Sequence, residues 1–211
     1  LVGIDTTKTF VRASIFFDFG TDGNDAVYYW DNVRFGEDEP PPEGIELING
    51  GFETGDFTGW TAFGDNTVGA PGVGPRSDAF AAQLTTTGGN GVAGVFQAFP
   101  ANPGEEFNLS AWMLTEAVLP EGVSFGEAKI VFKDAGGNDL VPASASIGSI
   151  NTDNPGVDSQ PFLDAASPVN EWVLTQAQGV APTGTVEVQF LLLNVDFAGG
   201  ENPIWFDDAQ A

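Results

Sequence analysis

The feature that most constrains this chain is a succession of short apolar segments, each ended by Gly, Pro, Asn or Asp, from residue 45 onward. Segments of this length between turn residues are typical of strands, and none of them has a convincing helical period. The pattern predicts an all-β fold, a β-sandwich or barrel. We expect strands near residues 46–49, 58–63, 80–87, 92–99, 106–116, 127–134, 143–149, 171–180, 185–195 and 203–210, and a long loop over 151–169.

Two segments of the chain are similar to each other. Residues 28–33 (YYWDNV) and 204–209 (IWFDDA) have the same type of sequence, and each follows a strand-like apolar run. The same strand pair is therefore expected twice. We interpret residues 1–36 as the C-terminal strand pair of a truncated preceding module, because too few residues precede it to form a domain. Residues 37–44, acidic with three consecutive prolines, predict a stiff linker, and residues 45–211 predict one complete β-sandwich module.

Composition excludes several classes of protein. The net charge is −24 with only six Lys and Arg residues, which argues against nucleic-acid binding because a phosphate backbone needs a basic surface. No stretch approaches the ~20 apolar residues of a membrane span, so we predict no membrane insertion. Cys and His are absent, which removes disulfides, thiolate chemistry and the Ser-His-Asp triad. We therefore predict an acidic protein that is not an enzyme and lies outside the cell or on its surface.

Motifs at both ends of the second module resemble a known group of proteins. Residues 48–53 have the sequence INGGFE, residues 59–60 are GW, and residues 205–208 are WFDD, with FNLSAW at 107–112 and EWVLT at 171–175 in the middle. These motifs resemble the galactose-binding-like jelly rolls, particularly the carbohydrate-binding modules of families 4, 9, 16 and 22. The resemblance covers nearly all of the second module and implies a jelly-roll β-sandwich, with the strand pair of another such module before it.

The resemblance also implies a structural Ca²⁺ where the first and last strands of the module meet. By position, its ligands are the backbone carbonyl of Gly51 and the carboxylates of Glu53 and Asp207, with Asp78 and the carbonyl of Ala81 at the remaining positions. This donor set is chemically sensible, because Ca²⁺ takes six to eight hard oxygens from carboxylates and carbonyls. The alternative is that Glu53 and Asp207 are terminal polar residues near a sheet edge.

A sugar site needs flat aromatic faces that stack on pyranose rings, with polar groups for the hydroxyls. The aromatic candidates of the module are Trp60, Phe63, Phe96, Trp112, Phe125, Phe162 and Trp172. Most of these are expected in the core. We select Phe125 and Phe162, which lie in loop-like contexts, and Trp112 and Trp172, for which a core position in a strand is the alternative. Tyr is missing from the module, which counts against a conventional sugar-binding cleft.

Two functions fit these observations. The first is a non-catalytic extracellular carbohydrate-binding-like module of a multi-modular protein, which binds a neutral glycan through exposed aromatic residues and carries a structural calcium. The second is a structural repeat of a surface adhesin, stalk or filament, in which neighbouring copies join by β-strand addition. Residues 8–35 favour the second, because their apolar face must be covered by this chain or by a neighbour. An exposed coplanar set of aromatic residues would favour the first.

Overall fold

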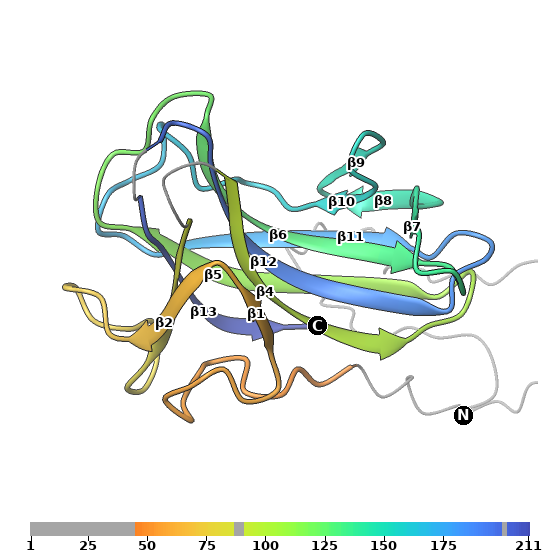
Figure 1. Cartoon of the computed structure of the whole chain (residues 1–211), viewed down its shortest axis with the longest axis horizontal. Coiled ribbons are helices and arrows are strands. Elements are labelled where there is room, and N and C mark those ends of the chain that lie inside the picture. Colours follow the sequence, from red (N-terminus) through yellow and green to blue (C-terminus); the bar gives the residue numbers. More distant parts are fainter. Residues whose placement is uncertain (1–44, 87–90, 200–201) are drawn as a thin grey trace, which may run out of the picture. The chain divides into compact units, whose positions relative to one another are not determined.

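The computed structural model describes residues 45–86, 91–199 and 202–211. Its regular elements in these ranges are all strands, which form two antiparallel sheets packed face to face (Figure 1). None of the described residues belongs to a helix long and apolar enough to cross a membrane. The all-β sandwich predicted from the sequence is confirmed. The strand pair expected within residues 1–36 and the linker over 37–44 lie outside the described residues.

The first sheet, here called sheet A, has the strand order β1-β4-β12-β6-β10-β9, and β7 pairs with β6 as a branch. Its strands are β1 (Thr61–Phe63), β4 (Gly91–Pro100), β12 (Glu187–Asp196), β6 (Ser124–Lys133), β10 (Gly156–Asp158), β9 (Ser149–Asn151) and β7 (Asp139–Leu140). The three long strands β4, β12 and β6 pair over nearly their whole lengths and form the centre of the sheet.

The second sheet, sheet B, has the order β2-β3-β13-β5-β11-β8. Its strands are β2 (Asp65–Gly69), β3 (Ala81–Thr85), β13 (Ile204–Gln210), β5 (Glu106–Thr115), β11 (Val173–Val180) and β8 (Ser144–Ile147). The last strand of the chain, β13, lies inside the sheet between β3 and β5. Apart from β2 and β3, neighbouring strands of this sheet are distant in sequence, because the chain repeatedly passes from one sheet to the other.

The core lies between the two sheets, and period-two alternation places its residues there. In β12, Val188, Phe190 and Leu192 are buried inward, whereas the residues between them face outward. The ring of Phe190 lies 6.1 Å from that of Phe107 in β5, which in turn lies 5.8 Å from that of Phe132 in β6. Full burial of a side chain of this size contributes about 1.5–3 kcal/mol, so these contacts between the sheets are a main source of stability.

The expected strand at 46–49 is wrong, and a strand over Asp65–Gly69 was missed. Asn49 has φ 54°, and the amide of Phe52 donates to its carbonyl at 3.1 Å, so the segment forms a turn. Asn tolerates this left-handed conformation better than other residues with a side chain. The missed strand, β2, is an edge strand in which Val68 is the single large apolar residue, so its sequence carries little signal.

The interpretation of the region 143–169 also needs correction. The expected strand at 143–149 is divided at Gly148 (φ 89°), where a Cβ would lie 2.2 Å from the carbonyl oxygen of Asp158. The expected loop over 151–169 contains β10, whose three residues are buried because Val157 and Asp158 pair with β6. This strand is short and lies among turn residues, so only the tertiary pairing identifies it.

Residues 70–80, here called the strap, contact the outer face of sheet B. Glu116 holds the strap by accepting the backbone amide of Gly72 at 2.6 Å and the indole N–H of Trp205 at 2.9 Å. Trp205 and Leu114 are neighbours on this outer face, and both are nearly inaccessible to solvent. The strap therefore covers a second, small apolar cluster outside the main core.

Candidate functional site

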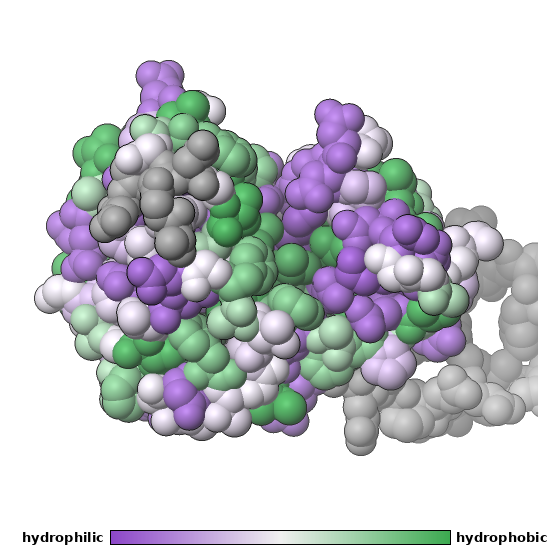
Figure 2. Space-filling model, viewed as in Figure 1, coloured by the Kyte–Doolittle hydropathy of each residue, from purple (hydrophilic) through white to green (hydrophobic). Residues whose placement is uncertain are grey.

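A cleft of about 310 Å³ lies on the outer face of sheet A. It is lined by Phe63, Val92, Phe96, Lys129, Val131, Lys133, Asp139, Asn154, Gln189, Leu191 and Leu193. Most of these side chains come from the outward positions of β4, β12 and β6, opposite the positions that build the core. Figure 2 shows hydrophobic surface in a hollow of the domain, bordered by hydrophilic residues. The cleft therefore combines an apolar floor with polar walls.

Two phenylalanines form the aromatic part of the cleft. Phe63 of β1 is paired with Gly94 of β4, and Phe96 of β4 is paired with Thr61 of β1. A Cβ on Gly94 would lie 2.7 Å from both the Phe63 ring and the Leu193 side chain. Glycine is thus required for Phe63 to lie directly on the sheet. Phe63 remains 37% exposed, which leaves part of its ring available to a ligand.

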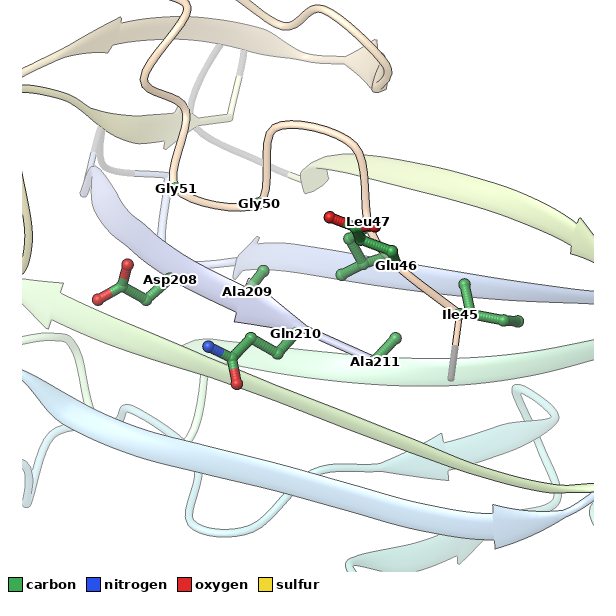
Figure 3. A pocket seen from close by; sticks show the side chains of 9 residues that line it. All are labelled: Ile45, Glu46, Leu47, Gly50, Gly51, Asp208, Ala209, Gln210 and Ala211. Carbon is green, nitrogen blue, oxygen red and sulfur yellow. The ribbon is translucent and has the colours of Figure 1, made fainter. Parts of the chain in front are cut away.

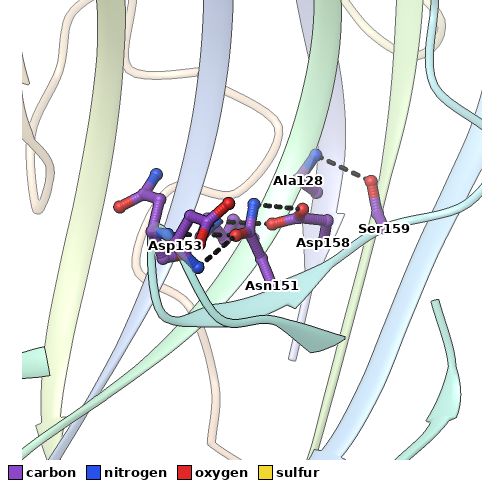
Figure 4. Close-up of polar contacts among 7 residues, drawn as sticks. Ala128, Asn151, Asp153, Asp158 and Ser159 are labelled. Atoms are coloured by element: carbon purple, nitrogen blue, oxygen red, sulfur yellow. Dashed lines mark hydrogen bonds and ion pairs between the residues drawn. The ribbon is translucent and has the colours of Figure 1, made fainter. Parts of the chain in front are cut away.

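A buried polar network forms one wall of the cleft (Figure 4). Lys129 donates from Nζ to Asp158 Oδ1 at 2.5 Å and to the carbonyl oxygen of Asn154 at 2.9 Å. Asn151 donates from its side-chain amide to the other oxygen of Asp158 at 2.9 Å. A lysine that is 1% exposed needs such partners, because an unpaired buried charge is costly. The network fixes the turn between β9 and β10 beside the cleft.

The charges at the cleft balance each other. Lys133 forms an ion pair with Asp139 at the rim, and Lys129 forms the buried pair with Asp158. These two lysines are two of the three cationic residues after residue 44. Because each is already neutralised by a carboxylate, the cleft has no surplus positive charge for an anionic ligand. Its electrostatics fit a neutral molecule that carries hydrogen-bonding groups.

Glu127 lies on the same outward face of β6, opposite Leu193 of β12. Its side chain is 5% exposed, and Oε2 has no hydrogen-bond partner among the described residues. Burial, and to a lesser extent the nearby Asp158, raises the pKa of Glu127, and Lys129 lowers it, so that the pKa lies at about 7. A buried acceptor without a donor is uncommon in folded proteins and marks a position where a ligand donor can be accommodated. The sequence analysis did not identify this residue.

Gly51, one of the residues expected to bind Ca²⁺, lies beside Asp208 where the opening segment of the module (residues 45–53) meets the end of β13 (Figure 3). A Cβ on Gly51 would lie 3.7 Å from Oδ1 of Asp207, 3.6 Å from Oδ1 of Asp208 and 3.7 Å from Cγ of Glu53. Asp208, which the sequence analysis did not select, therefore belongs to this cluster. The hollow here is larger, about 440 Å³, but aromatic side chains are absent from its lining.

The acids of this cluster bind the backbone of the strap. Asp207 Oδ2 accepts the amides of Arg76 at 2.8 Å and Ser77 at 3.2 Å, and Glu53 accepts the amides of Ala79 at 3.0 Å and Phe80 at 3.2 Å. Burial raises the pKa of Asp207 to about 6, although these amides lower it.

Asp78 is exposed with φ 45°, between the two sets of amides, and Ala81 is buried at the start of β3. Within the described residues, no three acidic side chains form a group that could hold a metal ion by themselves. A calcium ion at this position would need carbonyl oxygens such as those of Gly51 and Ala81 in addition to the carboxylates. Carboxylate oxygens that already accept an amide retain lone pairs for such an ion.

The structure places the two selected tryptophans on the outer face of sheet B, away from the cleft. Trp112 of β5 carries the guanidinium of Arg76 4.4 Å above its ring. Trp172, just before β11, donates from its indole to the carbonyl of Gly74 at 3.3 Å. Both are half-buried against the strap, which covers one face of the Trp112 ring and binds the indole N–H of Trp172.

The two selected phenylalanines are neighbours at one end of sheet A. Their ring centroids are 5.3 Å apart with an interplanar angle of 45°, so the rings are tilted rather than coplanar. Phe125 lies in β6 and not in a loop as expected, because Ser124 and Phe125 already pair with Asp196 and Val195 of β12. Phe162 lies in the loop that follows β10. Neither residue lines the cleft.

Comparisons with known proteins place this architecture in the jelly-roll β-sandwich class. No protein-family model matches the sequence, and the curated proteins contain no match to it. Among solved structures, the described domain has the fold of carbohydrate-binding modules of families 16 and 22.

Two of these structures cover most of the chain. The C-terminal family 22 module of Clostridium thermocellum Xyn10B matches with TM-score 0.52 and 16% identity, over 81% of this chain and 95% of that one. A family 16 module matches with TM-score 0.50 and 17% identity, over 79% and 96%. At this identity the likeness shows the fold.

A third structure is an enzymatically active domain of tailspike protein 4 from bacteriophage CBA120, with TM-score 0.51 and 17% identity. The match covers 79% of this chain but 21% of the tailspike chain. The similarity therefore concerns one part of a much larger protein.

Proposed function

We propose that residues 45–211 form a non-catalytic carbohydrate-binding module that binds a neutral glycan in the cleft on sheet A. The observation that carries this proposal is the cleft itself, in which Phe63 and Phe96 lie beside aliphatic side chains and a charge-balanced polar wall. Pyranose rings present apolar faces and hydroxyl groups, and this combination complements both. The carbohydrate-binding modules with the same fold support the assignment.

The absence of catalysis is part of the proposal. Among the acids at or beside the cleft, Asp139 and Asp158 are each paired with a lysine, which leaves Glu127 as a single unpaired carboxyl, whereas glycoside hydrolysis uses two acids. Incubation of the protein with each glycan should release no new reducing ends. If the wild type releases reducing ends and Asp139→Asn or Asp158→Asn does not, the proposal of a binding module is wrong and the protein is a glycosidase.

The binding test is isothermal titration with xylan, neutral glucans and mannan. Xylan is the first choice because a family 22 module of similar fold is a xylan-binding domain. Phe63→Ala and Phe96→Ala should weaken binding at least tenfold, since aromatic contacts in a binding site are among its largest contributions. Phe80→Ala is the matched control, because Phe80 is 36% exposed, similar to Phe63, but lies outside the cleft. Equal losses in all three variants would refute the cleft as the site.

We further propose that the module carries a structural Ca²⁺ held by Glu53, Asp207, Asp208 and the carbonyl of Gly51. Carboxylate oxygens of Asp207 and Asp208 and the Cγ atom of Glu53 all lie within 3.7 Å of the Cβ position at Gly51, which supports it. The ion would tie the opening segment to β13 and to the strap. EDTA should lower the melting temperature of the wild type but not of Asp207→Asn, because only the wild type has an intact site to lose. If EDTA leaves the melting temperature of the wild type unchanged, the structural Ca²⁺ is refuted.

The cellular setting and self-association remain predictions from the sequence. An extracellular or cell-surface location is proposed because the surface is strongly acidic and polysaccharides are the inferred ligand. Assembly of copies by strand addition rests on residues 8–35, which lie outside the described residues. In the described domain the edge strands are short, and short edges disfavour strand addition. Sedimentation of the full chain over a concentration series tests this alternative.

A further inference from the structure

The outward face of sheet A continues beyond the cleft along β6 and β12. Opposite Leu193, which lines the cleft, lies Glu127, and the next outward pair is Phe125 with Val195. The pairing extends one step past the strands, where the amide of Phe197 donates to the carbonyl of Val123 at 2.8 Å. The cleft and the aromatic end of the sheet are therefore parts of one row of side chains.

The far end of this row is apolar and accessible. Phe125 and Phe162 are both partly exposed with centroids 5.3 Å apart, and Phe197 is 56% exposed. Six residues separate Val131 in the cleft from Phe125, which corresponds to about 20 Å along a strand. A single sugar unit cannot reach both ends of such a row, whereas an oligosaccharide can.

Glu127 occupies the junction between the two apolar parts. The charged groups that face it are Lys129 on its own strand and Asp158 on β10, and the β12 residue opposite is the apolar Leu193. Lys129 already donates to Asp158 and to a backbone carbonyl, so it is engaged elsewhere. The buried Oε2 of Glu127 is consequently an acceptor without a donor among the described residues, between the polar wall of the cleft and the apolar end of the sheet.

We infer that the binding face extends from the cleft to the Phe125–Phe162 pair, and that Glu127 accepts hydrogen bonds from glycan hydroxyls at the junction. This inference rests on the proposed carbohydrate-binding function. It specifies the ligand class as a neutral oligosaccharide or polysaccharide chain bound along its length. Hydroxyl donors complement the unpartnered acceptor, and sugar ring faces complement the phenylalanines on either side.

The test is titration of the full chain with xylo-, cello- and manno-oligosaccharides from disaccharide to hexasaccharide, on wild type, Phe162→Ala and Glu127→Gln. We expect affinity to rise with chain length, and Phe162→Ala to remove the gain for the longest chains while leaving the disaccharide unchanged. Glu127→Gln should weaken the longer chains about tenfold, because a hydrogen bond to a charged acceptor becomes a neutral one. Melting curves verify that both variants are folded.

The pH profile separates a binding role from a structural one. With a pKa of about 7, Glu127 is ionised in about a tenth of the wild-type molecules at pH 6, so wild-type affinity should fall about tenfold from pH 8 to pH 6. Glu127→Gln should show no such change. The extension alone would be overturned by the following result: affinity does not depend on the length of the oligosaccharide, Phe162→Ala and Glu127→Gln bind like the wild type, and Phe63→Ala still abolishes binding. No binding of any oligosaccharide or polymer would overturn the proposed function and the extension together.

Discussion

Replacing Glu127 with glutamine should make the stability of the domain less dependent on pH. Burial raises the pKa of this carboxyl from its ordinary value of 4.5 to about 7. In the interval between these values the folded state holds a proton that the unfolded chain has released. Wild-type stability should therefore be fully present below pH 4.5, decrease as the pH rises through about 7, and level off above it.

The magnitude follows from the same interval. About 2.5 pH units at about 1.4 kcal/mol each give about 3.5 kcal/mol, and because the side chain is 5% exposed, solvent screens little of it. For a domain of this size, about 3.5 kcal/mol corresponds to about 7–14 °C in melting temperature. The assay is urea denaturation of wild type and Glu127→Gln from pH 4.5 to 8. Their difference in unfolding free energy isolates Glu127, because every other titrating group is shared.

A constant difference across this pH range would refute the reasoning, since Glu127 would then titrate alike in the folded and unfolded states. A difference with the opposite sign would show that a donor stabilises the ionised carboxylate. In either case Oε2 would not be the unpartnered acceptor that the structure describes. Under the proposed role of Glu127, the stability lost at neutral pH is what keeps this carboxylate available for a ligand, a trade-off that is common at functional sites.

Three further predictions concern packing and anchoring. Lys129→Met should destabilise the domain by about 3–5 kcal/mol, because it leaves its aspartate partner buried and unpaired. Gly50→Ala should lower the free energy of unfolding by about 1–3 kcal/mol or more, because its Cβ would lie 2.2 Å from a backbone carbonyl oxygen. Gly69→Ala is the control: no atom lies nearer than 3.8 Å to the new Cβ, so the free energy of unfolding should not change. Glu116→Ala should lower the free energy of unfolding by about 1–3 kcal/mol, because it removes the acceptor of the Gly72 amide and of the Trp205 indole. The fluorescence emission of Trp205 should shift to the red.

Urea denaturation measures all three changes, and tryptophan fluorescence also reports the strap. If Lys129→Met lowers the free energy of unfolding by less than 1 kcal/mol, the carboxylate of Asp158 is protonated or solvated in the variant. Equal stability of the two glycine variants would contradict the close approach of the opening segment to β13. Unchanged emission in Glu116→Ala would show that the strap stays closed without this anchor.

The sequence predicted the fold class because the signals for it are local. In β4, β5, β6, β11, β12 and β13, apolar residues at alternate positions lie between turn residues, and each strand was expected within about three residues of its observed ends. The end motifs also indicated that Gly51, Glu53 and Asp207 would meet, and the structure brings them together. Asp208 was missed because it follows Asp207 in the chain, and only its φ of 48° turns it toward the same place.

The site depends on which strands become neighbours, and that information is not local. Alternation gives each strand two faces but does not say which face will be the core and which the ligand surface. Phe63 and Phe96 come from strands separated by nearly thirty residues and meet because Gly94 allows a close approach. The two tryptophans lie on the other sheet, where the strap contacts both of them.

The amino-acid sequence by itself thus determined the all-β sandwich, its acidic surface, and the meeting of its two ends, since patterning and motifs act over a few residues. Tertiary structure alone decided that the cleft lies on sheet A and that Glu127 is a buried acceptor beside it. The physical reason is that burial, pairing register and the pKa of a carboxyl depend on residues that are distant in the chain and adjacent in space.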